Sequence, residues 1–160
     1  MSHQTTLTKH NEALGHILKE HREGLEFAGK VRKGIKSEVE TERMVAYVKW
    51  FWKEHLERHF DEEEKWLPKG LPREHPWMKR MFNEHENFRK LMGQVTNKAS
   101  YEILGQLAQD LEDHIGFEEH LLFHEVEKLA PTEMLHQIAE ALNMEEGCSW
   151  QWQDRFWVSQ

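Results

Sequence analysis

The sequence predicts an all-α protein, an up-down-up-down four-helix bundle followed by a short fifth helix and a tryptophan-rich C-terminal tail. Apolar residues recur at steps of three and four and almost never alternate, which is typical of amphipathic helices. The helical stretches are long and joined mostly by short connections, so neighbouring helices should pack antiparallel. The 160 residues have the size of one domain. We therefore expect a single domain over residues 1–160, with the bundle over about 8–130 and the fifth helix and tail over 131–160.

The first predicted helix covers residues 8–32, and Gly34 is expected to end it. The second begins between residues 37 and 41, where Ser37 and Glu40 have the spacing of a capping box, and Pro68 ends it. The positions expected to face the core in these two helices are Leu14, Ile17, Leu18, Leu25, Ala28, Val45, Val48, Trp52, Leu56 and Trp66.

Residues 68–76 hold three prolines and one glycine and are expected to form a loop. A third helix follows over residues 76–95, since proline suits a first helical turn. The fourth helix opens at Ser100 and continues to residue 130, and the fifth covers residues 132–144. The core-facing positions expected in the third and fourth helices are Met78, Met81, Phe88, Met92, Leu104, Leu107, Leu111, Leu121 and Leu129.

The tail over residues 148–160 carries Trp150, Trp152 and Trp157 and is too short to fold alone. We expect it to pack across the bundle, in preference to forming a partner-binding patch. A surface of the third helix or of this tail could also support a homodimer.

Composition excludes several classes of protein. The net charge of −8 argues against a nucleic-acid partner, because contacts to phosphates are made by clustered Lys and Arg. The longest apolar runs are far short of the roughly 20 residues that a membrane-spanning helix needs, so we expect no membrane partner. The first residues show no secretion signal, and Cys148 is the only cysteine, so we expect a cytoplasmic protein without an intramolecular disulfide.

An internal repeat carries the residues that suggest chemistry. The second and fourth predicted helices share a pattern in which a histidine is followed four residues later by two adjacent glutamates. The helix before each of them carries a Glu-His pair. The repeated positions are Glu20-His21, His59 with Glu63-Glu64, Glu84-His85, and His114 with Glu118-Glu119.

This spacing can direct the repeated residues to one inner site, because residues four apart lie on the same face of a helix. His85 and His114 are centred on position 99.5, close to the turn expected near Ser100, so they should sit level. His21 and His59 are centred on position 40, which fits less closely with a turn at Gly34.

The repeated residues also fall within the apolar stripes of their helices. An unpaired carboxylate in such a stripe costs several kcal/mol or is forced to neutralise, so converging glutamates and histidines indicate a bound cation. Mixed imidazole and carboxylate ligands suit iron, zinc or manganese, and the absence of cysteine ligands disfavours an iron–sulfur cluster.

These motifs resemble the hemerythrin-like, or HHE cation-binding, domains over roughly residues 19–129. The resemblance includes residues 47–52 (Tyr-Val-Lys-Trp-Phe-Trp) as well as the repeated motifs. It implies a non-haem centre of two iron ions, with Glu63 and Glu118 bridging the irons and four histidines as terminal ligands. The implied metal ligands are His21, His59, Glu63, His85, His114 and Glu118.

The sequence departs from the oxygen-carrying hemerythrins on the third helix. They have two histidines four residues apart there, whereas Met81 and Arg89 flank His85 at that spacing here. This leaves a coordination position open to water or filled by another histidine. It favours chemistry or sensing of oxygen, peroxide or nitric oxide over simple reversible oxygen carriage.

Other histidines and glutamates could extend the site. His16 is a rival to His21, and His55 could be a fifth ligand or, as we prefer, a partner that supports a ligand. We expect the remaining histidines to be surface or packing residues, and the remaining glutamates to be solvated or to orient a ligand imidazole. These are His10, His120 and His124, and Glu62, Glu64 and Glu119.

Three functions fit these observations. The first is a di-iron protein that binds or senses oxygen or nitric oxide. The second is an enzyme acting on oxygen, peroxide or nitric oxide, or an iron donor in iron–sulfur cluster repair. The third is a structural or interaction bundle stabilised by zinc.

Overall fold

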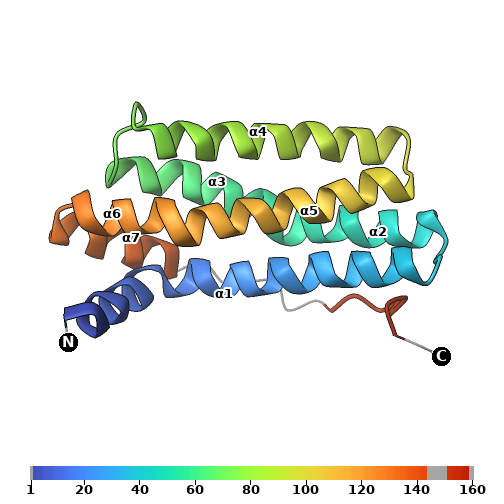
Figure 1. Ribbon diagram of the computed structural model, residues 1–160, viewed down its shortest axis with the longest axis horizontal. Helices are drawn as coiled ribbons and strands as arrows, with labels where there is room; N and C mark the ends of the chain where they lie inside the picture. Colours follow the sequence, from blue (N-terminus) through green and yellow to red (C-terminus); the bar gives the residue numbers. More distant parts are fainter. Residues whose placement is uncertain (1, 144–150, 159–160) are drawn as a thin grey trace.

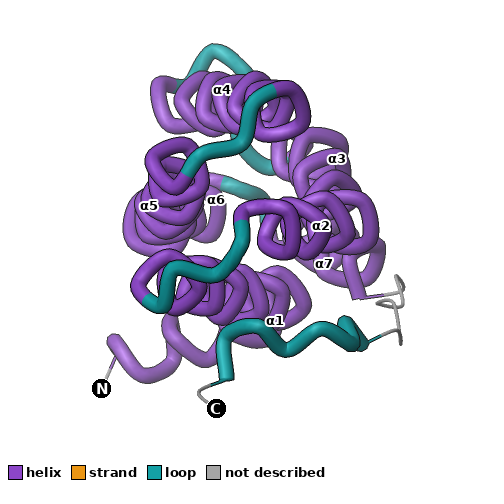
Figure 2. Tube along the Cα trace, turned by 90° about the vertical axis from the view of Figure 1, so that its right-hand side faces the viewer, coloured by secondary structure: helices purple, strands orange, loops and turns teal. Residues whose placement is uncertain are grey.

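The protein is described here by a computed structural model that covers residues 2–143 and 151–158, with side chains for residues 14–142 and 151–158. The described chain is all-helical and contains no strand (Figure 1). Its helices lie side by side along the long axis of the molecule, as the end-on view in Figure 2 shows. They are α1 (Ser2–Lys36), α2 (Thr41–Phe51), α3 (Glu57–Trp66), α4 (Pro76–Asn97), α5 (Tyr101–Phe117), α6 (Phe123–Leu129) and α7 (Thr132–Asn143). No helix in these ranges is long and apolar enough to cross a membrane.

Helix α1 is longer at both ends than the sequence predicts. It begins at Ser2, is kinked at Leu14, where φ is −113° and ψ is 17°, and ends at Lys36. Gly34 does not end it, so that prediction is wrong. A Cβ at position 34 would lie 2.5 Å from Met44 Sδ and 2.8 Å from the Phe156 ring, so this glycine allows both α2 and the tail to approach α1 closely. The left-handed residue in the turn is instead Glu38, with φ 54°.

The capping predictions are right for one helix and wrong for another. Ser100 precedes α5 and its side chain accepts a hydrogen bond from Ile103 N at 3.1 Å, as expected for an N-cap. The capping box predicted at Ser37 does not form, because α2 starts at Thr41 and residue 40 makes no side-chain capping bond.

Two π-helical turns interrupt the second and fourth predicted helices. The first, η1 (Trp52–Leu56), joins α2 to α3, and the second, η3 (Glu118–Leu122), joins α5 to α6. A π-turn holds more residues per turn than an α-helix and rotates the residues that follow it. The buried positions from the end of η3 onward are therefore Leu122, Phe123 and Val126.

Three leucines that were predicted to face the core are exposed. Leu121 and Leu129 are 38% and 52% exposed, because the predicted stripe assumed an unbroken α-helix through η3. Leu25 is 41% exposed, because Gly24 and Phe27 take the inward positions on that turn of α1.

The apolar core consists of two clusters separated by a polar layer. One, the tail-side cluster, includes Phe27, Val48, Phe88, Leu111 and Phe156. The other, the α7-side cluster, includes Leu14, Ile17, Met81, Phe123 and Ile138. On α1 and α4 the α7-side cluster precedes the predicted ligand and the tail-side cluster follows it. On the α5–α6 rod the order is reversed, and the two clusters meet between His114 and Glu118.

The described part of the tail packs across the bundle, as predicted. Phe156 is 5% exposed, and Trp152 and Trp157 pack against the tail-side cluster. Arg43 on α2 donates two hydrogen bonds to Asp154, at 2.9 and 2.7 Å. Cys148 and Trp150 lie outside the described residues.

Candidate metal centre

The six residues of the predicted site come together in the polar layer between the two apolar clusters. Four helical rods contribute them: α1, α3, α4, and the junction of α5 with η3. Each side chain is almost fully buried. The exposed fractions are 2% for His21, 4% for His59, 0% for Glu63, 0% for His85, 5% for His114 and 0% for Glu118.

One half of the site contains His21, His59 and both glutamates. His21 Nε2 lies 3.0 Å from Glu118 Oε1 and 3.7 Å from Glu63 Oε2. His59 Nε2 lies 3.2 Å from Glu63 Oε1, one helical turn along the same face of α3. These four residues each offer one ligand atom within 4.8 Å of the others.

The other half contains His85, His114 and the same two glutamates. His85 Nε2 lies 3.2 Å from Glu63 Oε1, and His114 Nε2 lies 3.2 Å from Glu118 Oε2. The two Nε2 atoms are 3.1 Å apart, and these four residues again form a group within 4.8 Å. Glu63 and Glu118 thus belong to both groups.

A second set of glutamates faces the outer nitrogens of the histidines. His85 Nδ1 donates to Glu64 Oε2 at 2.7 Å, and His114 Nδ1 donates to Glu84 Oε1 at 2.8 Å. Such partners fix the tautomer and the ring orientation of a ligand histidine. In the other half the contacts are longer.

In that half, Glu20 Oε1 lies 3.6 Å from His59 Nδ1, and Glu119 Oε1 lies 3.8 Å from His21 Nδ1. The outer glutamates are therefore Glu20, Glu64, Glu84 and Glu119. Each of them is adjacent in sequence to a predicted ligand, but its carboxylate contacts a histidine on a neighbouring rod. The four pairs therefore run from α1 to α3, α3 to α4, α4 to α5, and η3 back to α1, as a closed ring.

Several polar atoms of the site are buried and lack hydrogen-bond partners among the described residues. Both nitrogens of His21 and His59, and both oxygens of Glu63 and Glu118, are buried atoms without a hydrogen bond of normal geometry among the described residues. Buried polar groups are normally hydrogen-bonded, so atoms left in this state need another partner. Imidazole nitrogens and carboxylate oxygens converging without hydrogen bonds fit a pair of divalent cations.

The comparison with protein families agrees with this geometry. The family model for the hemerythrin HHE cation binding domain matches residues 12–126. The chain belongs to the hemerythrin HHE cation-binding family. The resemblance stated from the sequence is therefore confirmed. No curated protein and no solved structure matches the chain.

The electrostatics of this hemerythrin-like site follow from burial and from close opposite charges. Burial lowers the pKa of His59, but Glu63 and Glu20 outweigh it and raise that pKa to about 9. The pKa of His85 is also lowered by burial, yet hydrogen bonds to Glu118, Glu63 and Glu64 raise it well above its usual range.

The two shared glutamates shift in the opposite direction. Burial raises the pKa of Glu118, but His114, His21 and His85 hold it well below its usual range. Burial and Glu118 likewise raise the pKa of Glu63, and His59 and His21 reverse the shift. Both carboxyl groups are therefore ionised, which is the form that binds a cation.

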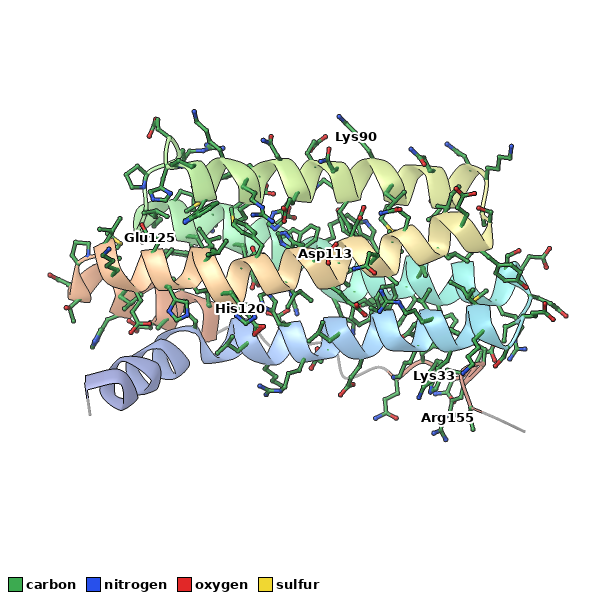
Figure 3. The ribbon with its side chains drawn as sticks, viewed as in Figure 1. Lys33, Lys90, Asp113, His120, Glu125 and Arg155 are labelled. Atoms are coloured by element: carbon green, nitrogen blue, oxygen red, sulfur yellow. The ribbon has the colours of Figure 1, made fainter. Side chains whose placement is uncertain are left out.

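The remaining histidines of the prediction lie elsewhere. His16 Nε2 contacts Glu20 Oε1 at 2.7 Å and belongs to neither group of four. His55 stacks on Phe51 and lies 3.8 Å from Glu23, and it belongs to neither group of four. His120 (labelled in Figure 3) and His124 are exposed. The side chain of His10 lies outside the described part.

The role of two outer glutamates, Glu20 and Glu84, is not predicted from the sequence. The signal was present, since each one directly precedes a predicted ligand histidine. Glu64 and Glu119 were among the glutamates considered for this role. Glu62 lies instead beside Arg58, with Arg58 Nε 3.7 Å from Glu62 Oε1.

The molecule also contains a cavity of about 700 Å³, apart from the six residues of the site. Residues of α1, α2, η1 and the tail line it. Its walls include Glu23, Tyr47, Trp50, His55, Trp152 and Trp157.

Proposed function

We propose that this hemerythrin-domain protein holds two iron ions as a non-haem di-iron centre, on an up-down-up-down bundle, and binds or senses oxygen or nitric oxide. His21 and His59 would serve one iron, His85 and His114 the other, and Glu63 and Glu118 both. The observation that carries the proposal is the sharing of both glutamates by two groups of four buried ligands. Connections at alternate ends of the bundle in Figure 1 support the proposed order of the helices.

The ligand count favours a centre that takes an additional small molecule. Each iron would receive two imidazoles and two shared carboxylates from the protein, which leaves positions open for an external ligand. Bound iron would supply the affinity for a diatomic molecule and the ability to exchange electrons with it.

The surroundings restrict what can reach the centre. The two shared glutamates and His85 are 0% exposed, and apolar clusters lie on both sides of the polar layer. A small uncharged molecule can enter such a site with little loss of hydration, whereas a large or charged substrate cannot. Oxygen and nitric oxide have the required size and neutrality.

A di-iron enzyme acting on oxygen, peroxide or nitric oxide is the second candidate. It is favoured by Glu64 and Glu84, whose side chains are 20% and 27% exposed and which hydrogen-bond to His85 and His114. These carboxylates connect the buried imidazoles to solvent and could carry protons for a reaction. Iron donation in cluster repair is an alternative role for the same centre.

The first experiment is metal analysis of the purified protein, with its absorption spectrum in air and after reduction. About two irons per chain, with visible bands that bleach on reduction and change on addition of nitric oxide, would support the proposal. Zinc at one ion per chain, with no redox-dependent spectrum, would contradict it and favour the structural bundle. Turnover of peroxide or nitric oxide by the iron-loaded protein would identify the enzyme.

A further inference from the structure

A third group of ligand-type side chains lies next to the metal centre but outside it. His16 and Glu20, one turn apart on α1, meet Glu62 from α3, and one ligand atom of each lies within 4.8 Å of the others. Their side chains are 15%, 8% and 10% exposed, so the group is closer to solvent than the six residues of the centre.

The group shares an unusual feature with the centre. Both oxygens of Glu20 and Nε2 of His16 are buried and make no hydrogen bond of normal geometry among the described residues, although the two side chains touch at 2.7 Å. The Glu20 side chain is more than nine-tenths buried and is directed at His16. Buried carboxylate oxygens in this state are normally satisfied by a partner, and here an imidazole and a second carboxylate stand beside them.

We propose that His16, Glu20 and Glu62 form a third cation site, more exposed than the proposed pair and sharing none of its six ligands. One nitrogen and two carboxylates suit zinc, manganese or ferrous iron, with water completing the coordination. An anion is excluded because two carboxylates would repel it.

Arg58 explains how the group is balanced in the absence of a cation. Its guanidinium lies 3.6 Å from Glu20 Oε2 and 3.7 Å from Glu62 Oε1, beyond the usual length of a charged hydrogen bond. Competition with this positive charge makes the third site weaker than the two sites of the pair.

The site also has a connection to the centre. Glu20 Oε1, which contacts His16, lies 3.6 Å from His59 Nδ1. A cation held by Glu20 would therefore bind next to one ligand of the pair without replacing any of them.

The test is equilibrium dialysis of the metal-free, full-length protein against rising free zinc, followed by metal analysis. We expect three zinc ions per chain, two bound tightly and one more weakly. His16→Ala and Glu62→Gln should each weaken the third zinc at least about tenfold and leave the first two in place. Arg58→Gln should tighten the third zinc, because the competing charge is removed.

His120→Ala is the matched control, since it removes an exposed histidine of the same protein and should retain three zinc ions. Glu118→Ala separates this inference from the proposed function, because it should lose the pair and keep the third zinc. A wild-type protein that binds only two zinc ions, or unchanged zinc binding in both His16→Ala and Glu62→Gln, would overturn the inference. Anomalous diffraction from zinc-soaked crystals should place the third ion between His16, Glu20 and Glu62.

Discussion

Replacing Glu118 by alanine should remove both of the proposed metal ions from the centre. Its carboxylate is 0% exposed and lies 3.0 Å from His21 Nε2, 3.2 Å from His114 Nε2 and 3.7 Å from His85 Nε2. Only Glu118 and Glu63 belong to both groups of four ligands. Glu118→Ala therefore takes one donor from each metal, whereas His59→Ala takes a donor from one metal only.

The loss of both metals sets the size of the effect on stability. An ion present at a hundredfold excess over its Kd stabilises the folded state by about 2.7 kcal/mol, so two ions contribute about 5 kcal/mol. For a chain of this length each kcal/mol moves Tm by roughly 2–4 °C. The metal-loaded wild type should therefore unfold about 10–20 °C above Glu118→Ala.

The assay combines metal analysis with thermal unfolding followed by circular dichroism, with and without a chelator. Chelation should lower the Tm of the wild type toward that of Glu118→Ala, leaving only the smaller cost of the missing side chain. His120→Ala should keep its metal and its Tm. The assignment of Glu118 as a shared ligand is refuted if Glu118→Ala retains both metals, or if the Tm difference persists in full after chelation.

Three further substitutions test other parts of the structure. Glu84→Gln should weaken metal binding about 10- to 100-fold in a chelator competition, because Glu84 orients His114 through a 2.8 Å hydrogen bond. Gly34→Ala should destabilise the fold by about 1–3 kcal/mol in urea unfolding, since the new Cβ would meet Met44 Sδ at 2.5 Å and the Phe156 ring at 2.8 Å. Burial lowers the pKa of His55, so protonation favours the unfolded chain and stability is lost as the pH falls below about 6.5. His55→Gln should flatten this part of the Tm–pH profile. An identical slope in the wild type and in His55→Gln would show that His55 does not cause this loss of stability.

The residues that converge in the candidate site could be predicted from sequence because the information is local. His59 and Glu63, or His114 and Glu118, lie one turn apart on a single rod, and the distance of 3.2 Å within each pair needs only α-helical geometry. Ser100 was identifiable for the same reason, since an N-cap depends on residues within one turn.

The errors arise where the structure departs from regular α-helix or depends on distant residues. A helical period of 3.6 residues predicts that Leu121 faces the core. The π-turn η3 rotates the chain, however, and Leu122 is buried instead. Gly34 resembles a helix stop, yet it is needed as glycine because Met44 on the next helix and Phe156 of the tail both occupy the space of a Cβ there. A pattern within one helix contains neither kind of information.

The ring of outer glutamates explains why the repeat contains pairs of polar residues rather than single ligands. In each pair, such as Glu84-His85, one residue points to the centre and its neighbour reaches a histidine on the next rod. A single Glu-His or Glu-Glu dipeptide thus places a ligand and also fixes the position of an adjacent rod. The pattern could be seen in the sequence, but the direction of each outer contact depends on which rods are neighbours.

The same ring makes the two halves of the centre unequal. The outer contacts of His85 and His114 are hydrogen bonds of 2.7 and 2.8 Å, whereas those of His59 and His21 are 3.6 and 3.8 Å. Outer partners at hydrogen-bond distance hold a ligand imidazole in one orientation and increase its basicity. The half with His85 and His114 is therefore the one whose imidazoles are oriented by outer hydrogen bonds. The half with His21 and His59 has only the longer contacts, and it is also the half next to the proposed third cation site at Glu20. A cation at that site would therefore lie beside the half whose histidines have the longer outer contacts.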